Sequence, residues 1–180
     1  MSRQAKAYGA ALYQLAAEEG LTHLLLEQLE GVDKVLAENP AYIRLLNLPS
    51  LPKKERMELV QQAFGQQVHG YLLNVLKLMT QAAAVDSLHG CWLEYRRLYD
   101  QEQGILRAVA VSAVPMTQQQ QQALTQKLEQ MTGKTVYLTN RVEEDCLGGV
   151  RLDLDGRQLD GTVQARLAQL RSLLAQPASF

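Results

Sequence analysis

The stretch GILRAVAVSAVPMTQQQ, residues 104–120, decides the fold, because the period of the hydrophobic pattern changes there. Before Gly104 the apolar residues recur every three or four positions, which is the spacing of amphipathic helices. After it, residues 105–114 are rich in valine and alanine and predict a mostly buried strand, which Pro115 ends. The chain therefore passes at Gly104 from a helical region into a region that contains strands.

The region before Gly104 predicts a six-helix bundle. Proline, glycine and asparagine punctuate it, which leaves helical segments at residues 3–19, 21–39, 40–47, 53–64, 68–82 and 84–103. Connections this short favour antiparallel neighbours that pack together. We therefore expect an N-terminal helical domain over residues 1–104. The basic cluster Lys53-Lys54-Glu55-Arg56 within it is interpreted as a solvated helical face.

The region after Gly104 predicts a small α/β domain over residues 105–180. Thr117 and Gln120 have the spacing of a capping box, which predicts the start of a helix. Further strands are expected at residues 135–139, 149–154 and 157–159, and a second helix at residues 162–174. The fold class is therefore α+β, a helical bundle followed by a domain of about four strands and two helices.

The bulk composition argues against several classes of function. The chain has 180 residues and 47% hydrophobic residues, enough to bury a core. Lysine and arginine total 18 against 19 for aspartate and glutamate, so no net basic field favours a nucleic-acid partner. The two cysteines, Cys91 and Cys146, form no disulfide framework. No apolar run is long enough to span a membrane, so any membrane association is expected to be indirect.

No constellation of residues predicts catalysis, a cofactor or a metal. The histidines His23, His69 and His89 lack metal-ligand spacing. Asp155-Gly156 fits a type I′ hairpin turn better than a calcium loop, because the glycine and the twelfth residue are wrong for that loop. The pair Gly148-Gly149 lacks the lysine of a phosphate-binding loop. We expect a surface built for binding.

Three segments carry a resemblance to a known family. They are AKAYGAALYQLA at residues 5–16, VSAVPMT at residues 111–117, and a C-terminal signature that contains Gly148, Gly149, Asp155, Gly156, Asp160 and Thr162. Together they resemble the delta subunit of F-type (rotary) ATP synthases, a family that includes the mitochondrial oligomycin-sensitivity-conferring protein. The resemblance runs from about residue 3 to residue 174. Many members carry serine at the position of Thr162, and both hydroxyls can begin a helix.

The resemblance implies a non-catalytic stator subunit of the peripheral stalk, which resists rotor torque during proton-driven ATP synthesis. It implies that a groove between the first and fifth helices holds the N-terminus of an ATP synthase alpha subunit, and that the C-terminal domain meets the C-terminal region of the b subunit. We expect the groove to be lined by Tyr8, Ala11, Leu12, Leu15, Val75 and Met79. Each of these residues can equally belong to the core of the bundle.

Two other functions remain open at this point. A free-standing helical adaptor of regulatory type has the same composition, and a cryptic hydrolase is a third class. Co-purification with catalytic-head and membrane subunits would separate the adaptor from the stator. The start of the chain does not look like a transit peptide, which favours the cytoplasmic side of a bacterial plasma membrane.

Overall fold

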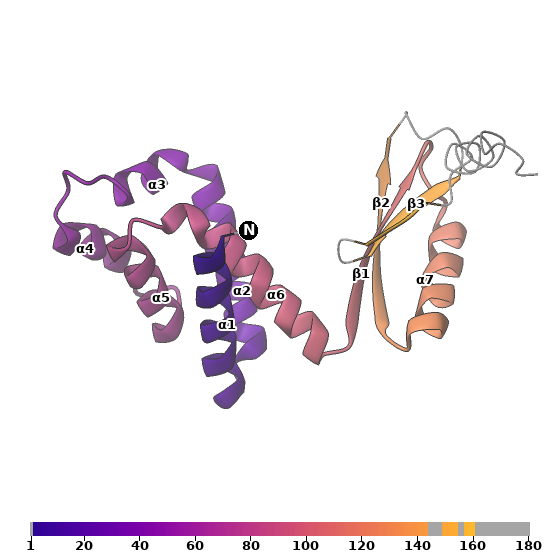
Figure 1. The fold of residues 1–180 in the computed structure, drawn as a ribbon, viewed down its shortest axis with the longest axis horizontal. Coiled ribbons are helices and arrows are strands. Elements are labelled where there is room, and N and C mark those ends of the chain that lie inside the picture. The colour runs from indigo at the N-terminus through magenta and orange to yellow at the C-terminus, as the bar shows by residue number, and fades with distance from the viewer. Residues whose placement is uncertain (1, 144–148, 155–156, 161–180) are drawn as a thin grey trace, which may run out of the picture. The chain divides into compact units, whose positions relative to one another are not determined.

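The computed structural model describes residues 2–143, 149–154 and 157–160. The chain divides into two compact units, Met1–Tyr99 and Asp100–Phe180, and each is described by itself. The first is helical and the second contains a sheet, so the mixed α+β class predicted from the sequence is confirmed (Figure 1).

The helical unit consists of helices joined by short connections, as their spacing in the sequence predicts. The helices are α1 (Arg3–Glu18), α2 (Thr22–Glu38), α3 (Pro40–Leu46), α4 (Lys53–Phe64), α5 (Gly70–Gln81), the 3-10 turn η1 (Val85–Ser87) and α6 (Leu88–Glu102), the last of which continues into the second unit. Local chemistry sets their starts. The Ser2 hydroxyl accepts a hydrogen bond from the Ala5 amide at 3.1 Å, which caps α1.

One core fills the helical unit. Its largest fully buried side chains come from each of the helices α1 to α6, and they include Leu12, Leu25, Leu46, Val60, Met79 and Tyr95. The Tyr95 hydroxyl donates to the Thr22 carbonyl at 2.9 Å, so this buried phenol has a partner. Burial raises the pKa of Tyr95 and keeps the phenol neutral.

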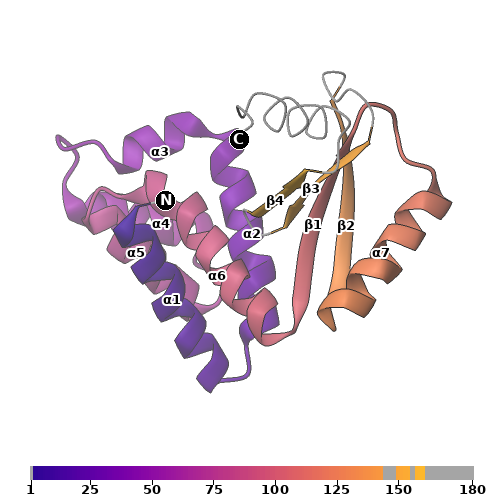
Figure 2. The ribbon, with the colours of Figure 1, turned by 45° about the vertical axis from the view of Figure 1, so that its right-hand side comes forward.

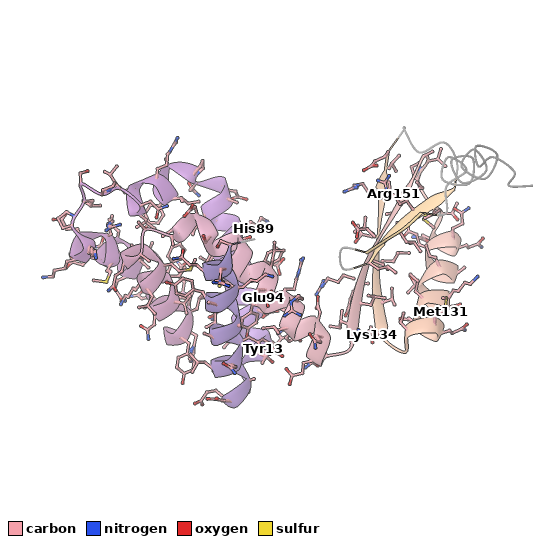
Figure 3. All side chains as sticks on the ribbon, viewed as in Figure 1. Tyr13, His89, Glu94, Met131, Lys134 and Arg151 are labelled. Carbon is pink, nitrogen blue, oxygen red and sulfur yellow. The ribbon has the colours of Figure 1, made fainter. Side chains whose placement is uncertain are left out.

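Gly9 of α1 packs closely against the backbone of α6. A Cβ atom at this position would lie 2.6 Å from the Cys91 carbonyl oxygen and 2.9 Å from the Glu94 Cβ. Only glycine permits this approach without a shift of backbone, since both helices are rigid elements. Figure 3 labels Tyr13 of α1 and Glu94 of α6.

Arg56 departs from the interpretation of its cluster as a solvated face. The side chain is buried, with 4% of its surface exposed. Its Nη1 donates to the Leu46 carbonyl at 3.0 Å and to the Thr80 carbonyl at 3.2 Å. These carbonyls lie at the C-terminal ends of α3 and α5, where carbonyls lack helical partners and the helix dipole favours a cation. Arg56 therefore ties the ends of two helices to α4.

The second unit is a four-stranded sheet with one described helix. Its elements are β1 (Ile105–Ser112), α7 (Gln118–Thr132), β2 (Thr135–Val142), β3 (Val150–Leu154) and β4 (Arg157–Asp160), and the strand order is β2-β1-β3-β4. Strands β1 and β2 are parallel, and the other pairs are antiparallel. Helix α7 lies on one face of the sheet, which Figure 2 shows from a second side. Leu106, Ala108, Leu128 and Val136 form the core between them.

The capping box at the start of α7 is confirmed. The Thr117 hydroxyl accepts from the Gln120 amide at 3.3 Å, and the Gln120 side chain accepts from the Thr117 amide at 2.9 Å. At the other end, Gly133 has a φ of 67°, the left-handed conformation that ends many helices.

Strands β1 and β2 differ most from the predicted bounds, while β3 and β4 each differ from theirs by one residue. Strand β1 stops at Ser112, whose hydroxyl donates to the Val114 carbonyl at 2.7 Å and turns the chain, so Val114 is 69% exposed. Strand β2 continues to Val142, because its last residues pair with the end of β1. A local hydrogen bond accompanies the end of β1, whereas pairing with β1, which local sequence does not reveal, decides the end of β2.

The signature residues are only partly described. The predicted hairpin is confirmed by the antiparallel pairing of Leu154 with Arg157. Gly149 has a φ of 90°, a conformation that favours glycine at the entry to β3. The backbone of Asp160 ends β4. Gly148, Asp155, Gly156, Thr162 and the predicted helix at residues 162–174 lie outside the described residues.

Candidate partner-binding surface

The structure separates the six predicted groove residues into two groups. Leu12 and Met79 have no exposed surface and Val75 has 7%, so these three belong to the core of the bundle. In the chain by itself their side chains are covered by neighbouring helices, and their contact with a partner stays a prediction. The remaining three reach the surface: Tyr8 is half-buried, Ala11 is exposed, and Leu15 is 42% exposed.

Helices α1 and α5 run antiparallel beside each other (Figures 1 and 2). At one end the Tyr71 hydroxyl at the start of α5 donates to Glu19, just after α1, at 3.4 Å. At the other end the Ser2 hydroxyl lies 3.5 Å from that of Ser87, shortly after α5. The two helices therefore present their flanks along a common seam.

The exposed residues of α1 face this seam. Tyr13, on the opposite flank of α1, packs edge-on against Tyr95 of α6 with ring centroids 5.2 Å apart. Tyr8, Ala11 and Leu15 recur at spacings of three and four, which places them together on the flank away from α6. The small side chain of Ala11 between two larger ones lets another helix approach closely.

On α5 the same logic identifies Leu78, which the sequence analysis missed. Lys77 points to the other side, since its ammonium donates to Gln61 of α4 at 2.7 Å. Leu78 is 51% exposed, and we assign it to the flank of α5 that is nearer to α1. The sequence held a clue to Leu78: α5 contains more apolar residues than its buried face uses, and Leu78 lies outside that face. We define Tyr8, Ala11, Leu15 and Leu78 as the α1/α5 surface.

The α1/α5 surface carries no charged side chain, so its chemistry is that of apolar contact.

On the far side of α1, the hydrogen bond from Arg97 lowers the pKa of the Glu94 carboxyl. Burial raises the pKa of the Cys91 thiol to about 12, which keeps this group protonated and unreactive at neutral pH. Within the described residues no group of three or more histidine, cysteine or acidic side chains is arranged to hold a metal ion.

The C-terminal unit carries a small ionic cluster. Glu143 accepts from Arg151 at 2.7 Å, and Arg141 lies at the same distance from its other carboxylate oxygen (Figure 3). The hydrogen bond from Arg151 is the main cause that lowers the pKa of Glu143. The cluster joins β2 to β3 across the sheet.

Among the described helices, none is both long and apolar enough to cross a membrane.

Comparison with known proteins places this geometry in a family. The pattern of the ATP synthase delta (OSCP) subunit family matches residues 5–174. The chain is 31% identical over 176 residues to ATP synthase subunit delta of Clostridioides difficile (strain 630), with 97% of each chain covered. It is 32% identical over 168 residues to ATP synthase subunit delta 2 of Syntrophotalea carbinolica, with 93% of this chain and 94% of the relative covered.

The fold also matches a solved structure. A chain in the cryo-EM structure of the Toxoplasma gondii mitochondrial ATP synthase hexamer superposes with a TM-score of 0.79. The two chains are 18% identical, and the match covers 98% of this chain and 99% of the other. At this identity the likeness shows that the two chains share a fold.

Proposed function

Because the chain belongs to the ATP synthase delta (OSCP) subunit family, whose members are non-catalytic peripheral-stalk subunits, we propose that its helical unit holds the N-terminus of an alpha subunit on the α1/α5 surface. The observation that carries this proposal is the exposure of Leu15 and Leu78 on two adjacent helices, with the small Ala11 between Tyr8 and Leu15 on α1. Isolated exposed leucines are ordinary, but a row of them along one seam fits an amphipathic helix laid into it.

The buried residues Leu12, Val75 and Met79 support this surface from beneath. Leu12 and Met79 fix the spacing of α1 and α5, so the exposed side chains keep their places when a partner is absent. A preformed surface loses little side-chain freedom on binding, which strengthens the contact. The stator must stay bound while the rotor turns, and a nanomolar contact corresponds to about 12 kcal/mol. A few buried apolar anchors can supply this free energy.

We assign the second contact, with the C-terminal region of the b subunit, to the unit Asp100–Phe180. A stator needs two attachment points, one on the catalytic head and one on the stalk, and the division of the chain into two units offers one for each. The chain would then lie on the cytoplasmic side of a bacterial plasma membrane and reach the membrane only through the complex during proton-driven ATP synthesis. The family match disfavours the free-standing adaptor, because relatives along the whole chain are synthase subunits.

The proposal is tested by binding of a synthetic peptide that carries the alpha N-terminal sequence of the same synthase. The substitution Leu15→Asp places a charge on the α1/α5 surface, and we expect calorimetry to show affinity reduced at least tenfold, since a charge buried against an apolar helix is costly. Circular dichroism should show an unchanged bundle, because Leu15 is 42% exposed.

Gln14→Asp is the matched control. Gln14 is exposed on the same helix, and the substitution adds the same charge outside the α1/α5 surface. We expect it to bind like the unmodified chain. Equal affinities of the two variants would remove α1 from the contact. Leu12→Asp does not serve as a test, because a carboxylate at a fully buried position unfolds the bundle before it reports on binding.

A further inference from the structure

Helix α1 continues the flank of the α1/α5 surface by one more turn and ends it in a carboxylate. Tyr8, Ala11 and Leu15 follow spacings of three and four, and the next step of three reaches Glu18, the last residue of the helix. Residues at these spacings share one flank of a helix. Gln4, four residues before Tyr8, begins the same stripe. The stripe is therefore uncharged from Gln4 to Leu15 and charged only at Glu18.

The flank of α5 beside this stripe carries uncharged side chains. Tyr71 identifies the flank, because its hydroxyl donates to the carboxylate of Glu19, directly after α1, at 3.4 Å. Asn74 and Leu78 lie three and seven residues beyond Tyr71, so they share its flank, and both are exposed. Since α1 and α5 run antiparallel, the acidic end of the α1 stripe lies beside the start of α5.

Glu18 has no counterion among the residues that the structure describes. Its side chain is exposed and forms neither an ion pair nor a hydrogen bond with them. The neighbouring Glu19, in contrast, accepts the hydrogen bond from Tyr71. The last turn of α1 contains no basic residue, although the helix dipole favours a cation there and makes an acidic side chain unfavourable. Glu18 and the negative end of α1 together place a negative potential at one end of an otherwise neutral surface.

A helix that lies on the α1/α5 surface meets this charge at one end only. Its apolar side chains contact Leu15 and Leu78, where an unpaired charge would lose its hydration at a cost. A lysine or arginine one turn beyond those apolar side chains reaches Glu18 at the edge, where both charges keep contact with water. At the opposite end the same cation would meet the neutral Gln4. Charge thereby distinguishes the two directions in which an apolar helix fits the surface.

We propose that Glu18 is a specificity-determining residue of the α1/α5 surface. Its carboxylate pairs with a lysine or arginine at one end of the apolar face of the bound alpha-subunit helix, and the pair sets the direction of that helix. The inference rests on the proposed function and specifies the chemistry of its partner. The apolar contacts supply most of the affinity, and the ion pair selects among apolar helices of similar shape.

Calorimetry with the full chain and the alpha N-terminal peptide tests this pairing. Glu18→Gln removes the charge and keeps the shape of the side chain, and we expect it to weaken binding about two- to fivefold at low ionic strength, the range of an exposed ion pair. The loss should disappear at about 1 M salt, because the charges are then screened. Glu38→Gln is the matched control and should bind like the unmodified chain, since Glu38 is also exposed and also the last residue of its helix, α2.

The stability of Glu18→Gln separates the ion pair from a role in the fold. We expect its melting temperature to equal or exceed that of the unmodified chain, because the substitution removes an acidic group from the negative end of α1. A lower melting temperature would assign the loss of binding to the helix itself and overturn the proposal.

Peptides in which one lysine or arginine at a time is replaced by glutamine identify the partner of Glu18. We expect one of them to bind the unmodified chain about two- to fivefold more weakly and to bind Glu18→Gln with no further loss. Losses that multiply for every peptide, a loss unchanged by salt, equal binding by Glu18→Gln and the control, or an alpha N-terminus without lysine or arginine would each overturn the role of Glu18 and leave the alpha contact intact. Failure of the unmodified chain to bind the unmodified peptide would overturn both.

Discussion

At the residue scale, Arg56 shows where sequence reasoning reaches its limit. Its neighbours Lys53, Lys54 and Glu55 are exposed, as the charge pattern predicts. Arg56 is buried because the ends of α3 and α5, residues far apart in the chain, meet beside it. The pattern of α4 cannot show this, since the partners are backbone carbonyls that every residue possesses. The positive charge is offset by two helix ends rather than by a carboxylate.

We predict that Arg56→Ala lowers the free energy of unfolding by about 3 kcal/mol, because two buried carbonyls lose a donor and the space of the side chain is left empty. Urea denaturation followed by circular dichroism measures this change. Lys54→Ala on the same helix is the control and should stay within about 0.5 kcal/mol of the unmodified chain. A loss for Arg56→Ala no larger than that of the control would mean that the carbonyls take water in its place.

At the element scale, the sequence predicts helix starts well and strand ends poorly. The capping box of α7 lies within four consecutive residues, so both partners are visible in the sequence. The length of β2 depends on its pairing with β1, thirty positions away in the chain by the register of Ile105 with Thr135. The same reason explains the α1/α5 surface: periodicity finds the apolar positions, but the packing of neighbouring helices decides that Leu12 is covered and Leu15 is not.

Removal of the Thr117 hydroxyl tests how much the N-terminal cap of α7 contributes to stability. We expect Thr117→Ala to destabilise the C-terminal unit by about 1 kcal/mol, because the Gln120 amide loses its acceptor. Thermal denaturation of the full chain, with hydrogen exchange in α7 as the local readout, measures the effect. Thr117→Ser keeps the hydroxyl and should retain the stability. A serine variant as unstable as the alanine variant would assign the effect to the lost methyl group.

At the scale of the whole molecule, each of the two units has a core of its own. The helical unit has a complete core of its own, formed by residues between Leu12 and Tyr95. The sheet and α7 bury a second, smaller core. The α1/α5 surface belongs to the unit with the first core, and the proposed contact with the b subunit is assigned to the unit with the second, so each proposed contact is built on one core. Of the signature residues that carry the family resemblance, the structure describes two in the second unit: Gly149 comes directly before β3, and Asp160 ends β4.

Separate cores predict that the fragment of residues 1–104 folds without the rest of the chain. We expect it to unfold cooperatively and to bind the alpha N-terminal peptide within about twofold of the full chain, because every residue of the α1/α5 surface and of its supporting core is present. Gly9→Ala should destabilise fragment and full chain equally, since the Cys91 carbonyl that a Cβ would meet lies within the fragment. A fragment that folds but binds at least tenfold more weakly would show that the C-terminal unit contributes to the grip on the catalytic head.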